Sequence, residues 1–399
     1  MQLLKMSQGN IMSFARGDII TPSTNLQLDT PSKINELRHT ISTSHLMNSA
    51  HNLHELIDQL FTFVKNRRNT DSASIQDLLE SGKEIKIFKG CPWSKYKTLK
   101  TLDWTAYDEI VASSISIMQI YYVLTLEALE KQYSSDDLAD DVWKKITNIL
   151  KSAFGLANEI QGQVSKLHRP NFDYIYHLNQ ILVQLLIIFK NIHVTHREIE
   201  VRFGDFEKVP EKLNTYVRIL IFVYNECAVL EQLKKSSQVA TLKRFVEILF
   251  SYYRSLFYYH KNELGIALAI NKYGLANSID QSKIRSKLHI KAVKSNVKDK
   301  HLWREEIRFM REFQDSTFPA AFRQNVATVV DILRILNSKY EKLNNSINFQ
   351  KVPSLEEVRH KYLFDSPDLP SGLQVPLADI NRFVPACLVE STNVQDVYF

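Results

Sequence analysis

One stretch of the sequence has residue types and a spacing that could bind a metal ion. Residues 193–200 read HVTHREIE, in which His193 and His196 are three positions apart and can share one face of a helix. No HExxH motif is present, and no second cluster of ligands lies nearby in the sequence. The favoured interpretation of residues 193–208 is therefore a short, charged and exposed linker, without a metal site.

Two other stretches could take part in catalysis. Cys91 precedes a proline and a tryptophan, and it would be a nucleophile only if a histidine packed beside it in the fold. Four aspartates between positions 136 and 141 form a dense acidic group, which capping and the dipole of a helix that begins there explain. An all-helical enzyme remains an alternative, but no acid–base, metal or cofactor constellation supports it.

A basic segment follows at residues 282–300. Its cations could contact an anionic membrane surface, at about 1 kcal/mol for each close charge. A nucleic-acid-binding solenoid is an alternative, but no aromatic residues alternate with the lysines to stack on bases. A solvated face is the plain interpretation, since charge runs usually have that role. The residues that we expect at an anionic surface are Lys283, Arg285, Lys287 and Lys291.

Composition limits the class of protein. The chain has 399 residues and a net charge of +6, but only 10 glycines, which argues against phosphate-binding loops. Its three cysteines are far apart and suggest no disulfide framework. The first residues lack the apolar core of a secretory signal, and no run approaches the length that spans a bilayer. We expect a soluble cytosolic or nuclear protein.

The central feature of the sequence is the stretch at residues 241–278, whose pattern predicts two helices that meet near residues 260–262. Aromatic side chains crowd the first helix, whereas the second carries Gly265, Ala269 and Ala276. Bulky side chains on small ones are typical of tetratricopeptide-type hairpins. An ordinary antiparallel helix pair in a bundle is the alternative. Either arrangement needs further helices to cover the hairpin.

The remaining chain predicts an all-α fold. A polar segment occupies residues 1–32, and one helical domain takes residues 33–399, including an extended C-terminal tail from about residue 350 that lies against the helices. An ordered loop is expected at residues 85–102, and Asp103 is expected to cap the helix that follows it. The predicted helices cover residues 33–47, 53–67, 74–80, 104–132, 134–166, 172–194, 216–230, 301–313 and 320–348.

Three stretches carry a resemblance to a known family. Trp93 is followed by WTAYDEIVASSISIMQIYYVL at residues 104–124, then by KNELGIALAINKYGLANSI at residues 261–279 and VPLADINRFVPACLV at residues 375–389. In this order they resemble the tryptophan and helix, the hairpin and the closing segment of the BRO-one domain, found at the N-termini of Alix and its fungal relatives. The acidic residue that follows tyrosine is shifted, since both Asp108 and Glu109 come after Tyr107.

The resemblance implies a fold of tetratricopeptide-like hairpins with extended terminal segments packed on them, and a non-enzymatic adaptor function without cofactor, metal or nucleic acid. Because the chain stops just past the domain, it resembles the PalC subgroup. Such adaptors bind the C-terminal helix of an ESCRT-III subunit and, with a calpain-like protease complex, support proteolytic activation of a transcription factor in the fungal ambient-pH response.

The same resemblance implies a cytoplasmic protein that is recruited to endosomal or plasma-membrane sites, with possible peripheral membrane contact. The alternatives are an endosomal sorting adaptor without a signalling role and a generic helical interaction scaffold. An amphipathic partner helix needs an exposed apolar strip, which the unusually apolar segments at 172–194 and 210–230 and the tail can supply. The expected partner-binding residues are Phe189, Tyr216, Leu220, Ile380 and Phe383, with core packing favoured for Phe189 and Leu220.

Overall fold

The structure of the protein is a computed structural model. It describes residues 31–43, 45–68, 74–89, 92–93, 103–133, 140–202, 212–234, 237–277 and 320–389. Within these ranges the regular elements are helices apart from one two-stranded sheet, which confirms the predicted all-α class. The chain forms two compact units, Met1–Asn179 with Leu377–Phe399 and Gln180–Pro376, and each is described by itself. The extent of the predicted single domain stays a prediction.

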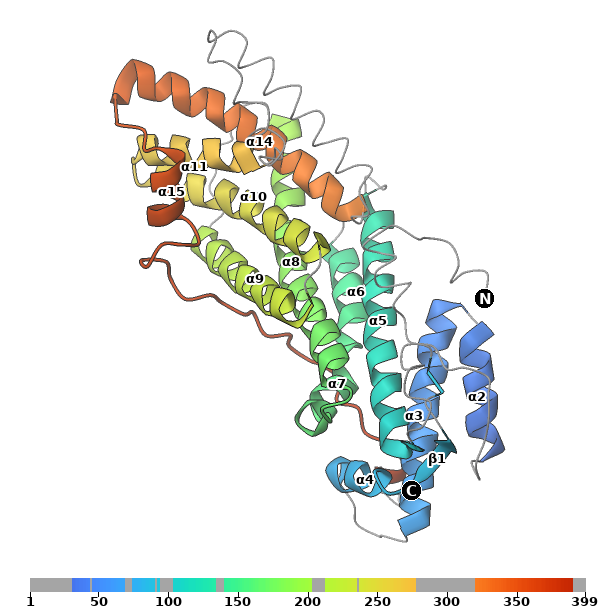
Figure 1. Ribbon diagram of the computed structural model, residues 1–399. Coiled ribbons are helices and arrows are strands. Elements are labelled where there is room, and N and C mark those ends of the chain that lie inside the picture. The colour runs from blue at the N-terminus through green and yellow to red at the C-terminus, as the bar shows by residue number, and fades with distance from the viewer. Residues whose placement is uncertain are drawn as a thin grey trace, which may run out of the picture. The chain divides into compact units, whose positions relative to one another are not determined.

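The first unit is built around α5 (Ala106–Tyr133), which packs against α3 (Leu46–Arg68) and α6 (Asp140–Lys151) (Figure 1). Ile110, Met118 and Leu126 of α5 are fully buried, and so are the small side chains of its serine-rich part. The other elements of this unit are α2 (Ser32–Thr43), α4 (Ile75–Gly82), β1 (Lys86–Lys89), β2 (Asp103–Thr105), α7 (Phe154–Ile160), η3 (Gln161–Gln163), the first part of α8 (Arg169–Arg202) and η5 (Ala386–Leu388).

The start of α5 corrects the sequence prediction. Thr105, and not Asp103, caps the helix: Asp108 N donates to Thr105 Oγ1 (3.2 Å), while the Asp108 carboxylate accepts from Thr105 N (3.0 Å). This reciprocal pair is a capping box. Asp103 lies instead in β2, where its carboxylate is 2.6 Å from Lys86 Nζ.

The predicted loop at residues 85–102 is wrong at its beginning, because β1 forms there. It pairs antiparallel with β2, with Lys86 opposite Thr105, Phe88 opposite Trp104 and Lys89 opposite Asp103. A strand of four residues is too short for its alternation to be recognised, and its partner comes only after residue 102.

The predicted helix over residues 134–166 is also divided. α6 ends at Lys151, and α7 begins at Phe154 after a short break. A Cβ on Gly155 would lie 2.5 Å from the Asn381 carbonyl oxygen, so glycine is needed where the C-terminal segment passes. Arg382 fixes that segment to α7 through an ion pair with Glu159 (Nε to Oε1, 2.7 Å).

The second unit contains the predicted hairpin, formed by α10 (Ser237–His260) and α11 (Leu264–Asn277). The turn places Asn262 at φ 61°, a left-handed conformation that asparagine tolerates. The helices approach closely at Gly274, where a Cβ would lie 2.7 Å from Ser251 Cβ, whereas Gly265 faces the Lys351 carbonyl. α9 (Leu213–Leu233) packs against α10, and α14 (Ala320–Leu343) packs against α11 (Figure 1).

α8 is longer than predicted. It continues from the expected segment through to Arg202, so the proposed linker at residues 193–208 is helical over its first part. Charged residues alone do not end a helix, and no glycine or proline occurs there before Gly204.

The C-terminal tail begins with a short π-helix, η4 (Asn344–Asn348), and includes a helix that the sequence analysis missed. α15 (Leu355–Tyr362) begins two residues after Pro353, and Ser354 caps it by accepting a hydrogen bond from Glu357 N (3.2 Å). Proline is compatible with a helix that starts after it, so the prolines of the tail do not exclude helix throughout. The predicted helix at residues 301–313 lies outside the described residues.

Three helices are long and apolar enough to cross a membrane by length and composition, although the sequence analysis expected none. The apolar windows in Ala106–Lys131, Arg169–Thr195 and Leu213–Leu233 are 89%, 67% and 44% buried. Most of the apolar surface of α5 is therefore covered by protein, whereas more than half of the α9 window is not.

Candidate functional site

The expected partner-binding residues divide between the two units. Phe189 and Leu220 are fully buried in the second unit. The Phe189 ring lies edge-on to Phe322, with centroids 5.1 Å apart, and 6.0 Å from Phe245. Their burial leaves no surface for a partner, so their role in this structure is core packing.

Tyr216 is half-buried at the start of α9 and keeps access to solvent. Its ring lies 5.4 Å from Tyr253, whose hydroxyl donates to Asn191 Oδ1 (2.7 Å). Burial raises the pKa of Tyr216, so its phenol is neutral at physiological pH. Its contact with a partner stays a prediction.

Ile380 and Phe383 are half-buried in the first unit. The Phe383 ring packs on α3, with its centroid 6.2 Å from both His54 and Phe61. This contact attaches the tail to α3, so a substitution at Phe383 would disturb the tail as well as any partner contact.

Phe364 attaches the tail to the second unit. Its ring stacks on Tyr224 of α9, with centroids 3.7 Å apart and planes 3° from parallel, and lies 4.2 Å from Phe250 of α10. Just before it, the Tyr362 carbonyl accepts a hydrogen bond from Arg254 Nε (3.4 Å). The aromatic slot between α9 and α10 is thus filled by the chain's own tail.

The tail then runs along α9 and α8 in an extended conformation (Figure 1). Leu373 N donates to the Arg218 carbonyl (2.9 Å), and the Gln184 amide exchanges two hydrogen bonds with the Val375 backbone (2.9 and 3.0 Å). A Cβ on Gly372 would lie 2.9 Å from Phe222 N, so the tail touches the helix backbone itself. The tail therefore covers one flank of α9.

The outer face of α9 beyond the tail carries a stripe of apolar side chains that the sequence analysis missed, with Phe222 next to Gly372 of the tail and Glu226 between Phe222 and Val229. Phe222, Val229 and Leu233 lie on one side of the helix, because they are seven and then four positions apart. The first two are half-buried and Leu233 is 37% exposed. The signal in the sequence was their shared helical phase, opposite to the buried Leu220 and Cys227.

A buried charged cluster lies in the first unit. Glu109 is completely buried and accepts hydrogen bonds at Oε2 from the indoles of Trp93 (2.6 Å) and Trp104 (2.8 Å). Arg38 Nη1 lies 2.8 Å from Glu109 Oε1, as an ion pair without hydrogen-bond alignment. The same guanidinium lies 4.2 Å from the Phe88 ring centroid. One carboxylate therefore joins α2, the segment at Trp93, β2 and α5.

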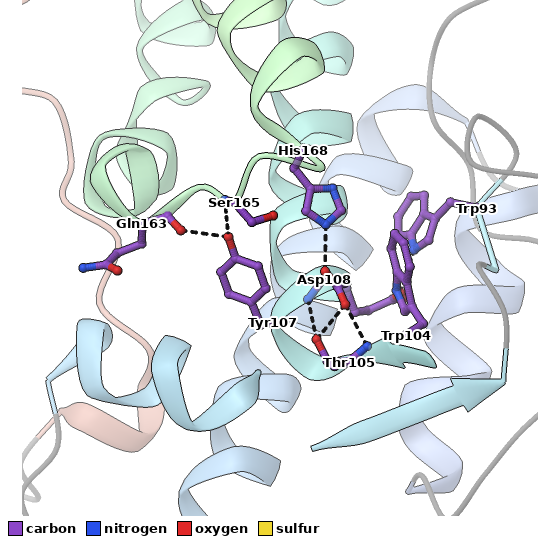
Figure 2. Close-up of polar contacts among 9 residues, drawn as sticks. Trp93, Trp104, Thr105, Tyr107, Asp108, Gln163, Ser165 and His168 are labelled. Carbon is purple, nitrogen blue, oxygen red and sulfur yellow. Dashed lines mark hydrogen bonds and ion pairs between the residues drawn. The ribbon is translucent and has the colours of Figure 1, made fainter. Parts of the chain in front are cut away.

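A second pair lies beside it (Figure 2). His168 Nε2 is 2.9 Å from Asp108 Oδ1, and the His168 ring meets Trp104 edge-on at 5.4 Å. Burial alone would raise the pKa of Asp108, but hydrogen bonds from His168 and Thr105 outweigh it, and the pKa lies below its ordinary value. Tyr107 completes the group by linking the Gln163 carbonyl and Ser165 N (2.8 and 2.6 Å).

These acids have structural partners rather than access to a substrate. Glu109 has no exposed surface, and His168 is also fully buried. Among the described residues, no group of three or more histidine, cysteine or acidic side chains is placed to hold a metal ion. Burial raises the pKa of Cys227, which leaves it a thiol.

Several predicted site residues cannot be placed. Cys91 and the basic residues Lys283, Arg285, Lys287 and Lys291 lie outside the described residues. His193 belongs to α8, but the side chains from His196 onward are also outside them. The roles proposed for these residues stay predictions.

Comparison with known proteins gives a family and distant structural likenesses. No curated protein matches the sequence. The structure entitled "Structure basis for endosomal targeting by the Bro1 domain" superposes with a TM-score of 0.48 and 14% identity, covering 86% of this chain and 83% of that one. A family model described as "Family of unknown function (DUF5355)" matches residues 104–398, well over half of the chain. The protein therefore belongs to this family of unknown function, DUF5355.

Proposed function

We propose that the protein is a non-enzymatic adaptor that binds the C-terminal helix of an ESCRT-III subunit. The three stretches that resemble the BRO-one domain suggest this class of partner. The observation that carries the proposal is the apolar stripe of α9. Only 44% of the apolar window of this helix is buried, so part of its apolar surface is not covered by the rest of the unit. An amphipathic helix recognises such a stripe by laying its apolar face along it.

The stripe has the dimensions of a helix-binding site. Phe222 and Leu233 are separated by about 16 Å along α9, which matches about three turns of a partner helix. Tyr216 lies on the same helix but about 120° around it from Phe222, and its ring contacts Tyr253 of α10 at 5.4 Å, so it lies outside the stripe. The charges around the stripe are mixed: Lys234 lies at its end, Glu226 lies on it, and Arg218 donates hydrogen bonds to Ser371 of the tail (3.0 and 3.4 Å).

The cellular role that follows is support for proteolytic activation of a transcription factor in the fungal ambient-pH response, as in the PalC subgroup. The adaptor would act beside a calpain-like protease complex, and it would be recruited from the cytoplasm to endosomal or plasma-membrane sites. An endosomal sorting adaptor without a signalling role is the second candidate, and a generic helical scaffold is the third. In cells that lack the gene, lost processing of the transcription factor with normal cargo sorting favours the first.

Calorimetric titration of the full chain with C-terminal helix peptides of ESCRT-III subunits tests the partner. Val229→Asp and Leu233→Asp place a charge on the stripe and should weaken binding at least about tenfold. Ile335→Asp is the matched control, since Ile335 is 44% exposed on α14 in the same unit. Circular dichroism checks that each variant is folded.

Two outcomes overturn the proposal. Folded wild-type protein that binds none of the ESCRT-III peptides excludes this partner class. Binding that survives at full strength in both stripe variants moves the site away from α9. Phe383→Asp is a poor probe because of the contacts of Phe383 with His54 and Phe61.

A further inference from the structure

The two most exposed large apolar side chains in the described part of the chain lie two residues apart. Phe349 is 75% exposed and Ile347 is 67% exposed, both where the chain leaves α14 for α15 in the second unit (Figure 1). A single exposed apolar residue is ordinary, but an exposed phenylalanine and isoleucine side by side indicate a contact surface.

The backbone of this tip is unusual. Ile347 belongs to the π-helix η4, which ends α14 with Phe349 as its left-handed cap. Phe349 has φ 49°, in the left-handed region that bulky residues avoid. Such a conformation persists only where the surroundings impose it, and it is a reason to look for function.

Hydrogen bonds impose it here. Phe349 N donates to the Asn344 carbonyl (2.7 Å), and the Asn344 side chain binds both the N–H and the carbonyl of Gln350 (3.0 and 2.9 Å). The Gln350 amide in turn donates to the Asn262 carbonyl (2.7 Å) and accepts from Gly265 N (2.9 Å). These hydrogen bonds fix the tip to the turn between α10 and α11. The backbone at Phe349 is therefore already ordered before any binding, so binding costs little further conformational entropy of the backbone.

The charges around the tip are mainly positive. Lys342 and Lys351 flank it in sequence, and Lys261 is next to Asn262 in the adjoining turn. All three lysines are exposed, and Lys261 Nζ lies 4.5 Å from the centroid of the Phe257 ring. The nearby Glu341 is neutralised by Lys272 at 3.1 Å, which leaves Glu263 and Glu356 as the opposing acids.

We infer that residues 347–349 form an apolar tip that inserts into the interface of an anionic phospholipid membrane. Two side chains are far too few for a stable protein interface, which takes about 800 Å² from each partner. Apolar side chains surrounded by lysines suit a bilayer with anionic headgroups, where the rings enter the acyl boundary and the cations stay at the surface. This inference does not depend on binding of the ESCRT-III helix at α9.

Sedimentation of the full chain with vesicles tests the inference. Wild-type protein should bind phosphatidylcholine vesicles that contain about one-third phosphatidylserine, and bind less when salt rises from about 0.1 M to about 0.5 M. Phe349→Ser with Ile347→Ser should weaken binding about tenfold or more, because both side chains lose their transfer into the bilayer. Ile335→Ser is the control, and it removes an exposed isoleucine from another part of the unit.

Phe349→Trp gives a direct readout of insertion. Its added fluorescence should shift to the blue with anionic vesicles and be quenched by lipids brominated in the acyl chain. The inference is overturned if wild-type protein does not bind anionic vesicles, a result that favours a protein partner for the tip. It is also overturned if the double serine variant binds the vesicles as strongly as the Ile335→Ser control. Unchanged binding of ESCRT-III peptide by the double variant separates this result from failure at α9.

Discussion

Replacing Phe364 with alanine removes the ring that holds the tail in the slot between α9 and α10. A fully buried Phe→Ala change costs about 3–5 kcal/mol of unfolding free energy. Because Phe364 is half-buried, about half of that applies, and loss of its stacked contact with Tyr224 adds about 1 kcal/mol. The expected destabilisation is about 2.5–3.5 kcal/mol.

Urea unfolding followed by circular dichroism measures this loss, and the same chain supplies a control. Phe349→Ala changes the same residue type on the same tail, but its ring is 75% exposed, so the expected effect is within about 0.5 kcal/mol. Hydrogen exchange gives a local readout, because the amides of Leu373 and Val375 are bonded to Arg218 and Gln184. Both amides should exchange faster in Phe364→Ala.

The reasoning is refuted if the two alanine variants unfold with the same free energy. It is also refuted if Phe364→Ala is destabilised while the Leu373 and Val375 amides keep wild-type protection. The second result would mean that the ring contributes to the core of α9 and α10 but does not hold the tail.

Three further expectations concern other contacts. Gly372→Ala places a Cβ 2.9 Å from Phe222 N and should destabilise the protein by about 1–3 kcal/mol in urea unfolding, with faster exchange along the tail. Arg38→Met leaves Glu109 charged and buried without its ion pair, and should cost about 3–5 kcal/mol; a double-mutant cycle with Glu109→Gln checks the coupling. Burial, and then the charge of His51, lower the pKa of His54 below 6.5 in the folded protein. The contribution of neutral His54 to the free energy of unfolding is therefore complete above about pH 6.5 and is lost as the pH falls through the folded pKa. In His54→Leu, the free energy of unfolding should depend less on pH over this range.

The helices that could be predicted are those with strong apolar periodicity and clear neighbours. The hairpin at residues 241–278 is confirmed as two packed helices, α10 and α11, because its signal is a local pattern within one stretch of sequence. The errors occur where distant residues decide the outcome. β1 forms because β2 pairs with it, and Gly155 of α7 leaves room for the Asn381 carbonyl.

The site was harder to predict than the fold. Apolar content identifies α8 and α9 as unusual, but it cannot separate Phe189 and Leu220, which are buried, from Val229 and Leu233, which keep exposed surface. The exposure of Phe349 has no sequence signal at all. It follows from a left-handed backbone that the amides of Asn344 and Gln350 impose across two segments.

α9 connects these observations. Its composition is as suited to crossing a membrane as that of α5, yet only 44% of its apolar window is buried, against 89% for α5. Within the second unit, α10 covers one side of α9, and the tail covers a flank through Phe364 and Gly372. Phe222 packs beside Gly372 of the tail, whereas Val229 and Leu233 keep apolar surface on the outer face of α9. A partner that covers them would bury an apolar stripe already bordered by the chain's own tail, and for this reason α9 is where a binding partner should be sought.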